Sequence, residues 1–203
     1  ANTAYKSDGL ALLTNGANAQ ETVDTLTKLD GKREQRQLGV VDAHGTSATY
    51  TGAECGDWAG GVAGDGYAIQ GNILEGSRVI ALMEEAWLGS DKREPLARRL
   101  LAALAAGDAA GGDKRGRQSA GLYVVGDEGG YGGGDDVLVD LRVDDHTAPI
   151  PELVRLLTIH DMLFGKPDPK DLMRLSGSLA EEVRSLLGAQ GYIAGDVTTA
   201  ELD

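Results

Sequence analysis

The sequence predicts a mixed domain in which helices and antiparallel strands form separate layers. Apolar residues recur at helical spacing in some segments and at every second position in others. The order of these segments is helices, strands, helices, strands, helix. Because this order does not repeat a strand–helix–strand unit, it favours layered α/β packing over a regular parallel sheet.

The N-terminal part is predicted to contain two helices and then a hairpin. Gly9–Leu13 forms the first, short helix, and Asn18 with Glu21 resembles a capping box at the start of a second helix that runs to Leu29. The hairpin is predicted from Leu38, Val40, Ala48 and Tyr50, which alternate on either side of a turn at 42–45.

The remaining elements follow from periodicity and from the positions of glycine and proline. A glycine-rich connection at 56–66 leads to a strand at 67–70. Two amphipathic helices come next, and Gly107 is expected to end the second. A strand at 119–125, apolar enough to be covered on both faces, precedes the clearest strand, at 137–143. A helix opened by Pro149 and Pro151 comes next. A linker at 165–169 separates it from a last helix, which covers 179–187.

Composition excludes several classes of function. The 203 residues carry a formal charge of −13, which argues against nucleic acid as a partner because phosphate binding needs a basic surface. No apolar run is long enough to cross a bilayer, and the single Cys55 fits a reducing compartment, so a cytoplasmic location is expected. The three histidines are scattered without metal-binding spacing, and no cofactor is expected. A homodimer is left open.

The strand at 137–143 carries the strongest group of polar residues. Asp140, Arg142 and Asp144 fall on the face opposite four aliphatic residues, where each carboxylate can pair with the guanidinium. Asp145 and His146 follow at the end of the strand, a common place for functional groups. This pattern indicates a site for a small anionic or amide substrate, or else a solvated strand face with a row of ion pairs. Neither interpretation is favoured.

Two further motifs are candidates for binding. The segment 111–119 combines glycines with Lys114, Arg115 and Arg117, which predicts an anion site or a solvated turn, and it lacks the Walker pattern. Gln70 and Asn72 lie at the end of a predicted strand, where side-chain amides can hold a substrate or an oxyanion. Asn72 is better explained as the N-cap of the helix that follows.

Four motifs occur in order along the chain: Arg36–Asp42, Tyr67–Asn72, Gly112–Ala120 and Val139–His146. Together they resemble the bacterial family known as domain of unknown function 1028. The resemblance covers about 1–165 and implies a fold like that of the N-terminal-nucleophile (Ntn) hydrolases, a four-layer αββα sandwich of two antiparallel sheets between helices. Residues 166–203 are similar to a linker and the start of a small helical, peptidoglycan-binding-like module. The first strand pair of the family would precede Ala1, so the nucleophile is expected upstream of Ala1.

The resemblance therefore implies an Ntn-type hydrolase that acts on a small-molecule, amide or peptide-like substrate. The alternative is a non-catalytic protein that binds a small ligand or a cell-wall fragment on the same scaffold. A third hypothesis is a cation-dependent hydrolase built on Asp140, Asp144 and Asp145. The residues expected to line the substrate pocket are Gln70, Asn72, Arg117, Ser119, Asp140, Arg142, Asp145 and His146.

Overall fold

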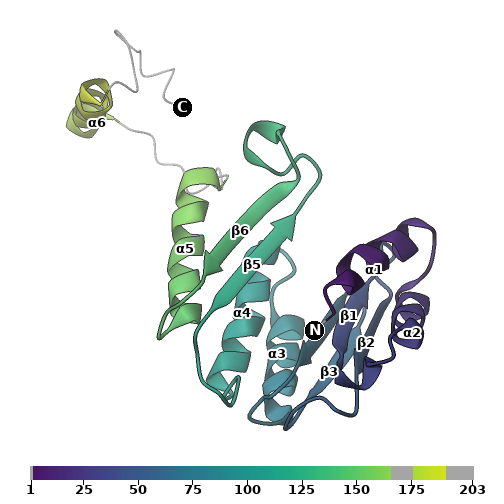
Figure 1. Cartoon of the computed structure of the whole chain (residues 1–203). Coiled ribbons are helices and arrows are strands. Elements are labelled where there is room, and N and C mark those ends of the chain that lie inside the picture. Colours follow the sequence, from purple (N-terminus) through teal and green to yellow (C-terminus); the bar gives the residue numbers. More distant parts are fainter. Residues whose placement is uncertain (1, 166–175, 191–203) are drawn as a thin grey trace. The chain divides into compact units, whose positions relative to one another are not determined.

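A computed structural model of the chain describes residues 2–165 and 176–190 (Figure 1). It divides the chain into two units, Ala1–Leu163 and Phe164–Asp203. Helices and small antiparallel sheets build the first unit, which confirms the α+β class. Its elements in chain order are α1 (Ala4–Thr14), α2 (Ala19–Leu29), the 3₁₀ turn η1 (Arg33–Gln35), β1 (Gln37–Val41), β2 (Ser47–Thr51), β3 (Gly60–Gly64), β4 (Tyr67–Gly71), α3 (Ser77–Gly89), α4 (Leu96–Ala109), β5 (Ala120–Val125), the 3₁₀ turn η2 (Tyr131–Gly133), β6 (Val137–Val143) and α5 (Pro149–Phe164).

In the second unit the structure describes one helix, α6 (Gly177–Ala189), which contains the amphipathic helix predicted at 179–187. Most of the predicted linker, and the part of the predicted C-terminal module beyond residue 190, lie outside the described residues. No helix in the described ranges is both long enough and apolar enough to cross a membrane.

Helix α2 begins with the predicted capping box. The Asn18 side chain accepts a hydrogen bond from the Glu21 amide at 3.0 Å, and the Glu21 carboxylate accepts one from the Asn18 amide at 2.9 Å. These two bonds satisfy amides that a helix start would otherwise leave free. The apolar stripe of the helix faces the hairpin β1–β2. The core between them consists of Ala19, Val23 and Ala48, with Leu38, Val40 and Tyr50 packed around it.

The hairpin β1–β2 contacts a second hairpin, β3–β4, through small residues. A Cβ atom added to Gly39 would lie 3.0 Å from Cβ of Ala68, and one added to Gly61 would lie 2.9 Å from Oγ1 of Thr49. The expectation that 56–66 is only a connection was therefore wrong. Strand β3 carries one large apolar residue, Val62, because its other face must stay small for this close approach.

Helices α3 and α4 pack against each other, and α3 also contacts β3 and β4. Gly107 does not end α4 as predicted, because the helix continues to Ala109. Its role is steric: a Cβ atom at Gly107 would lie 2.8 Å from Cγ and Sδ of Met83 on α3. Glycine thus lets the two helices approach closely at this point.

The strands β5 and β6 form a separate antiparallel hairpin whose inner face packs on α4 and α5 (Figure 1). The predicted division of β6 is confirmed, since Val139 and Val143 are buried while Asp140 and Arg142 are exposed. The expectation that β5 is covered on both faces was wrong, because Tyr123 is 56% exposed. The core here is formed by Ala97, Leu101, Leu122, Val124, Val139, Val143, Ile150, Leu153 and Leu157.

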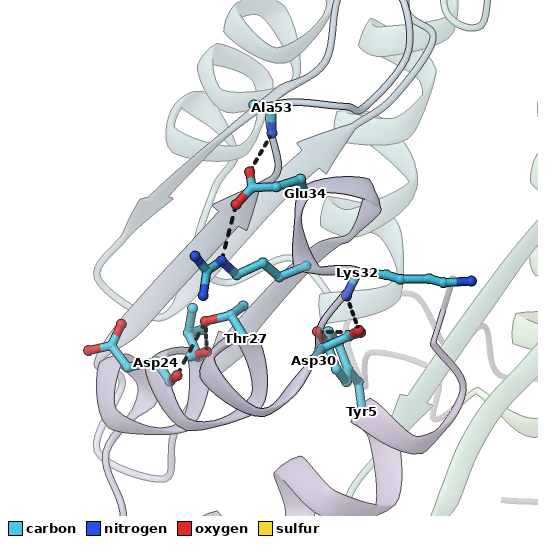
Figure 2. Close-up of polar contacts among 9 residues, drawn as sticks. Tyr5, Asp24, Thr27, Asp30, Lys32, Glu34 and Ala53 are labelled. Carbon is cyan, nitrogen blue, oxygen red and sulfur yellow. Dashed lines mark hydrogen bonds and ion pairs between the residues drawn. The ribbon is translucent and has the colours of Figure 1, made fainter.

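Asp30 joins α1 to the end of α2 (Figure 2). Its carboxylate accepts hydrogen bonds from the Tyr5 hydroxyl at 3.0 Å, from Nε of Arg36 at 2.8 Å and from the Lys32 amide at 2.8 Å. The Arg36 guanidinium, and next the Lys32 amide, hold the pKa of the Asp30 carboxyl well below its usual range. Burial and the nearby carboxylate raise the pKa of Tyr5 to about 12. This network fastens α1 to the rest of the unit.

Candidate functional site

A hollow of about 720 Å³ lies where the end of β4, helices α3 and α4, the segment 112–119 and the start of α5 meet. We call it the polar hollow. Its lining combines aliphatic side chains with polar groups, as small-molecule sites commonly do. The aliphatic part includes Leu74, Val79, Met83, Leu104 and Ile150, and the polar part includes Gln70, Asp108, Asp113, Arg115, Arg117, Gln118, Ser119 and Asp145.

The segment 112–119 is fastened to the chain that follows β4. The Lys114 amide donates to the carbonyl of Ile73 at 2.9 Å, and the Glu75 amide donates to the carbonyl of Gly112, also at 2.9 Å. Gly112 has a φ of 59°, a left-handed conformation that glycine adopts without steric cost. The Asp113 carboxylate accepts from the Arg115 amide at 2.8 Å and closes a local turn. These bonds give one wall of the hollow a defined backbone.

The arginines of this segment are already paired with carboxylates. Nε of Arg117 lies 2.6 Å from Oδ1 of Asp108, and Nη2 of Arg115 lies 2.6 Å from Oδ2 of Asp113. The Asp108 carboxylate raises the pKa of Arg117, and the Arg115 guanidinium lowers the pKa of Asp113. The two guanidinium groups of the expected positive island are therefore neutralised within the chain itself, and this arrangement disfavours the binding of an anion by either of them.

Gln118, Ser119 and Asp145 are described residues of the hollow whose polar side chains remain available to a ligand. The His146 amide donates to the carbonyl of Gln118 at 2.8 Å, which holds the start of β5 next to the end of β6. This bond brings the segment that carries Gln118 and Ser119 close to the one that carries Asp145. All three side chains are exposed. Within the described ranges none of the three makes a side-chain hydrogen bond or ion pair, so each can contact a ligand.

The predicted pair Asp140 and Arg142 lies apart from the polar hollow, on the exposed face of β6. Their side chains form a two-bond ion pair, with both N–O distances at 2.9 Å. Together with Lys6 and Tyr123 they line a second hollow of about 660 Å³, and Ser119 borders both hollows. Six of the eight predicted site residues therefore line one or both of two separate hollows.

The other predicted residues have contacts within the chain. Oδ1 of Asn72 accepts from the Gly56 amide at 2.9 Å, so Asn72 fastens a loop. The expectation that Asn72 caps a helix was wrong, because α3 starts at Ser77 and its N-cap is Gly76. Nδ1 of His146 accepts from the Ala148 amide at 3.0 Å, just before α5 begins. Neither Asn72 nor His146 lines the two hollows.

Gln70 borders the polar hollow, but its amide oxygen is directed toward β1. A Cβ atom added to Gly39 would lie 2.2 Å from Oε1 of Gln70. The absence of a side chain at Gly39 thus makes room for this amide between the two hairpins. Gln70 contributes to the wall of the hollow, and its amide oxygen is placed beside β1.

In the part of the chain that the structure describes, no group of three or more histidine, cysteine, aspartate or glutamate side chains could hold a metal ion. Asp140, Asp144 and Asp145 do not form such a group. The hypothesis of a cation-dependent hydrolase therefore receives no support from these three carboxylates.

Asp108 and Gln118 line the hollow and were not predicted as site residues. Asp108 occupies the last turn of α4, where the helix dipole disfavours a carboxylate, and this was a usable signal that it needs a cationic partner. Gln118 lies within the motif at 112–120 but has no feature that separates it from a solvated loop residue. Its role follows only from the backbone bond between Gln118 and His146.

Comparisons with known proteins identify the family. Residues 1–153 match the family of unknown function DUF1028. The chain belongs to this family. The DUF1028 chain is also similar to a protein from Silicibacter pomeroyi of the same family, whose crystal structure superimposes with a TM-score of 0.69. The two are 29% identical, and the match covers 90% of this chain and 72% of the other. No curated protein sequence matches.

Proposed function

We propose that this DUF1028 chain provides the substrate-binding part of an Ntn-type hydrolase, and that the polar hollow binds a small amide or peptide-like molecule. The observation that carries the proposal is the meeting of Gln118, Ser119 and Asp145, from two separate segments, beside an aliphatic lining. Their side chains offer an amide, a hydroxyl and a carboxylate. Such groups recognise the N–H and C=O of an amide without a cofactor.

The packing order supports the hydrolase-like scaffold. Helix α2 contacts the hairpin β1–β2, this hairpin contacts β3–β4, and α3 contacts β3–β4 on its other side. A four-layer αββα sandwich requires this order. A fold supports many activities, so it is the site that must establish the reaction.

The chemical step needs a nucleophile that the polar hollow does not supply. Ser119 is the hydroxyl residue of its lining, and within the described ranges its hydroxyl makes no hydrogen bond to a base. Activation of serine requires such a base. We therefore place the nucleophile of the proposed hydrolase outside these residues, at the N-terminal position that the fold uses.

A non-catalytic binding protein is the second candidate. It is favoured by the pairing of Arg115 and Arg117 with carboxylates, which leaves no free cation among the described residues of the hollow to stabilise a developing oxyanion. The ligand would then be a small molecule or a cell-wall fragment. Residues 166–203 would serve as a peptidoglycan-binding-like module in that case.

The first experiment tests binding with a neutral amide. N-acetylglycinamide is titrated into the ¹⁵N-labelled chain, and we expect saturable chemical-shift changes at 112–119 and 145–150. The variant Gln118→Ala should weaken this binding, whereas Gln20→Ala, an exposed position on α2, should leave it unchanged. The absence of saturable shifts, or an equal loss in both variants, would refute binding at the hollow.

The second experiment separates hydrolysis from binding alone. The gene product is expressed from its own start codon, and its intact mass and N-terminal sequence are determined. A mature N-terminal Thr, Ser or Cys with a free amine supports the hydrolase, and substitution of that residue should abolish the hydrolysis of small amides. A first residue without a nucleophile refutes the hydrolase and leaves the binding protein.

A further inference from the structure

We propose that the polar hollow selects amides that also carry a positively charged amine, and that Asp145 is the residue that recognises the amine. This inference rests on the proposed function, because it specifies which amides the hollow would bind. It adds a substrate class and a specificity-determining residue to that proposal.

The argument starts from the charges that line the hollow. These belong to Asp108, Asp113, Arg115, Arg117 and Asp145. The first four form two close ion pairs, each with an N–O distance of 2.6 Å. Asp145 has no such partner in the described part of the chain. The hollow therefore holds one uncompensated negative charge, and a ligand that brings a positive charge balances it.

The place of Asp145 fits this role. It comes two residues after the end of β6 and immediately before His146, whose amide is bonded to the carbonyl of Gln118 at 2.8 Å. Asp145 is thus the immediate neighbour in sequence of the residue whose hydrogen bond joins the two segments of the hollow. A ligand whose amide contacts Gln118 or Ser119 can direct a neighbouring ammonium group toward Asp145.

The wider electrostatics act in the same direction. The chain carries a formal charge of −13, which attracts cations and repels carboxylate ligands over distances of about the Debye length, ~10 Å. The aliphatic residues Val79, Met83 and Ile150 of the lining can contact the carbon atoms of a cationic ligand. Among the described residues no group of three or more histidine, cysteine, aspartate or glutamate side chains could hold a metal ion, so we take an organic ammonium as the cation of the ligand.

Three probes of similar size test the inference at about pH 6.5, where the α-amine is protonated. Glycinamide is cationic, N-acetylglycinamide is neutral and N-acetylglycine is anionic. We expect glycinamide to bind about fivefold more tightly than N-acetylglycinamide, and N-acetylglycine to bind most weakly. Dissociation constants are measured by NMR titration of the intact chain.

The variants Asp145→Asn and Asp144→Asn make the test specific, because they remove the same charge at adjacent positions. Asp145→Asn should abolish the preference for glycinamide, and Asp144→Asn should retain it. A preference that survives Asp145→Asn, or that falls equally in both variants, overturns the inference while neutral-amide binding stands. If none of the three probes binds, the proposed function itself fails. Thermal unfolding of both variants ensures that folded proteins are compared.

Discussion

Replacing Leu153 with alanine should lower the free energy of unfolding of the first unit by about 3 to 4 kcal/mol. Leu153 is 0% exposed, and it lies in the core that joins α4 and α5 to the hairpin β5–β6. The substitution removes three buried carbons, worth about 2.4 kcal/mol at ~0.8 kcal/mol each, and it leaves a cavity that adds to this loss. The same core supports the ends of β5 and β6, next to Ser119 and Asp145.

The expected change is large enough to measure by thermal unfolding. With an unfolding entropy of about 2.1 cal/mol/K per residue, a unit of this size should lose about 9 to 12 °C in Tm. The matched control is Leu163→Ala on the same helix, where the leucine is 69% exposed and the loss should be below about 0.5 kcal/mol. Equal shifts in the two variants would show that α5 does not pack on β5–β6 through Leu153, and the reasoning would be refuted.

Three other substitutions test local features, each by thermal unfolding. Asn18→Ala removes the cap of α2 and should cost about 1 kcal/mol, whereas an equal loss in Gln20→Ala would contradict the cap. Gly52→Ala places a Cβ atom 2.3 Å from the Glu34 carbonyl oxygen and should cost about 1–3 kcal/mol, while Gly31→Ala meets no atom within 4 Å and should be tolerated. The ionised Asp30 carboxylate stabilises the fold at pH values above its unfolded-state pKa of about 3.9. This stabilisation is lost as the pH falls below that value toward the lower folded-state pKa of Asp30. The wild type should therefore lose more Tm in acid than Asp30→Asn, and parallel losses would contradict the network.

Local sequence patterns predicted the helices and strands whose formation depends on residues close together in the chain. The capping box at Asn18 and Glu21 defined the start of α2 because both of its hydrogen bonds lie within one helical turn. The alternation of Leu38 and Val40 placed β1, since a half-buried strand shows a period of two. The same rule divided β6 into a buried and an exposed face.

Tertiary packing explains what the sequence did not predict. Strand β3, with the sequence GGVAG, lacks an alternating pattern because one of its faces must stay small against the hairpin β1–β2. A glycine such as Gly107 is typical of the end of a helix, yet here it lies within α4, where Met83 of α3 leaves no room for a side chain. The pairing of Arg117 with Asp108 also depends on how the segment after α4 turns back on the helix. None of these contacts has a signature within one short window of sequence.

The two hollows differ in whether they contain predicted side chains that are still free to bind a ligand. On the exposed face of β6, both carboxylate oxygens of Asp140 accept hydrogen bonds from the Arg142 guanidinium. A ligand that binds there would first have to break this ion pair. In the polar hollow, Gln118 and Asp145 bring groups that are not used within the described part of the chain. A ligand gains new hydrogen bonds there without displacing old ones. For this reason ligand binding should be sought first in the polar hollow, and not at the charged residues Asp140 and Arg142 of β6.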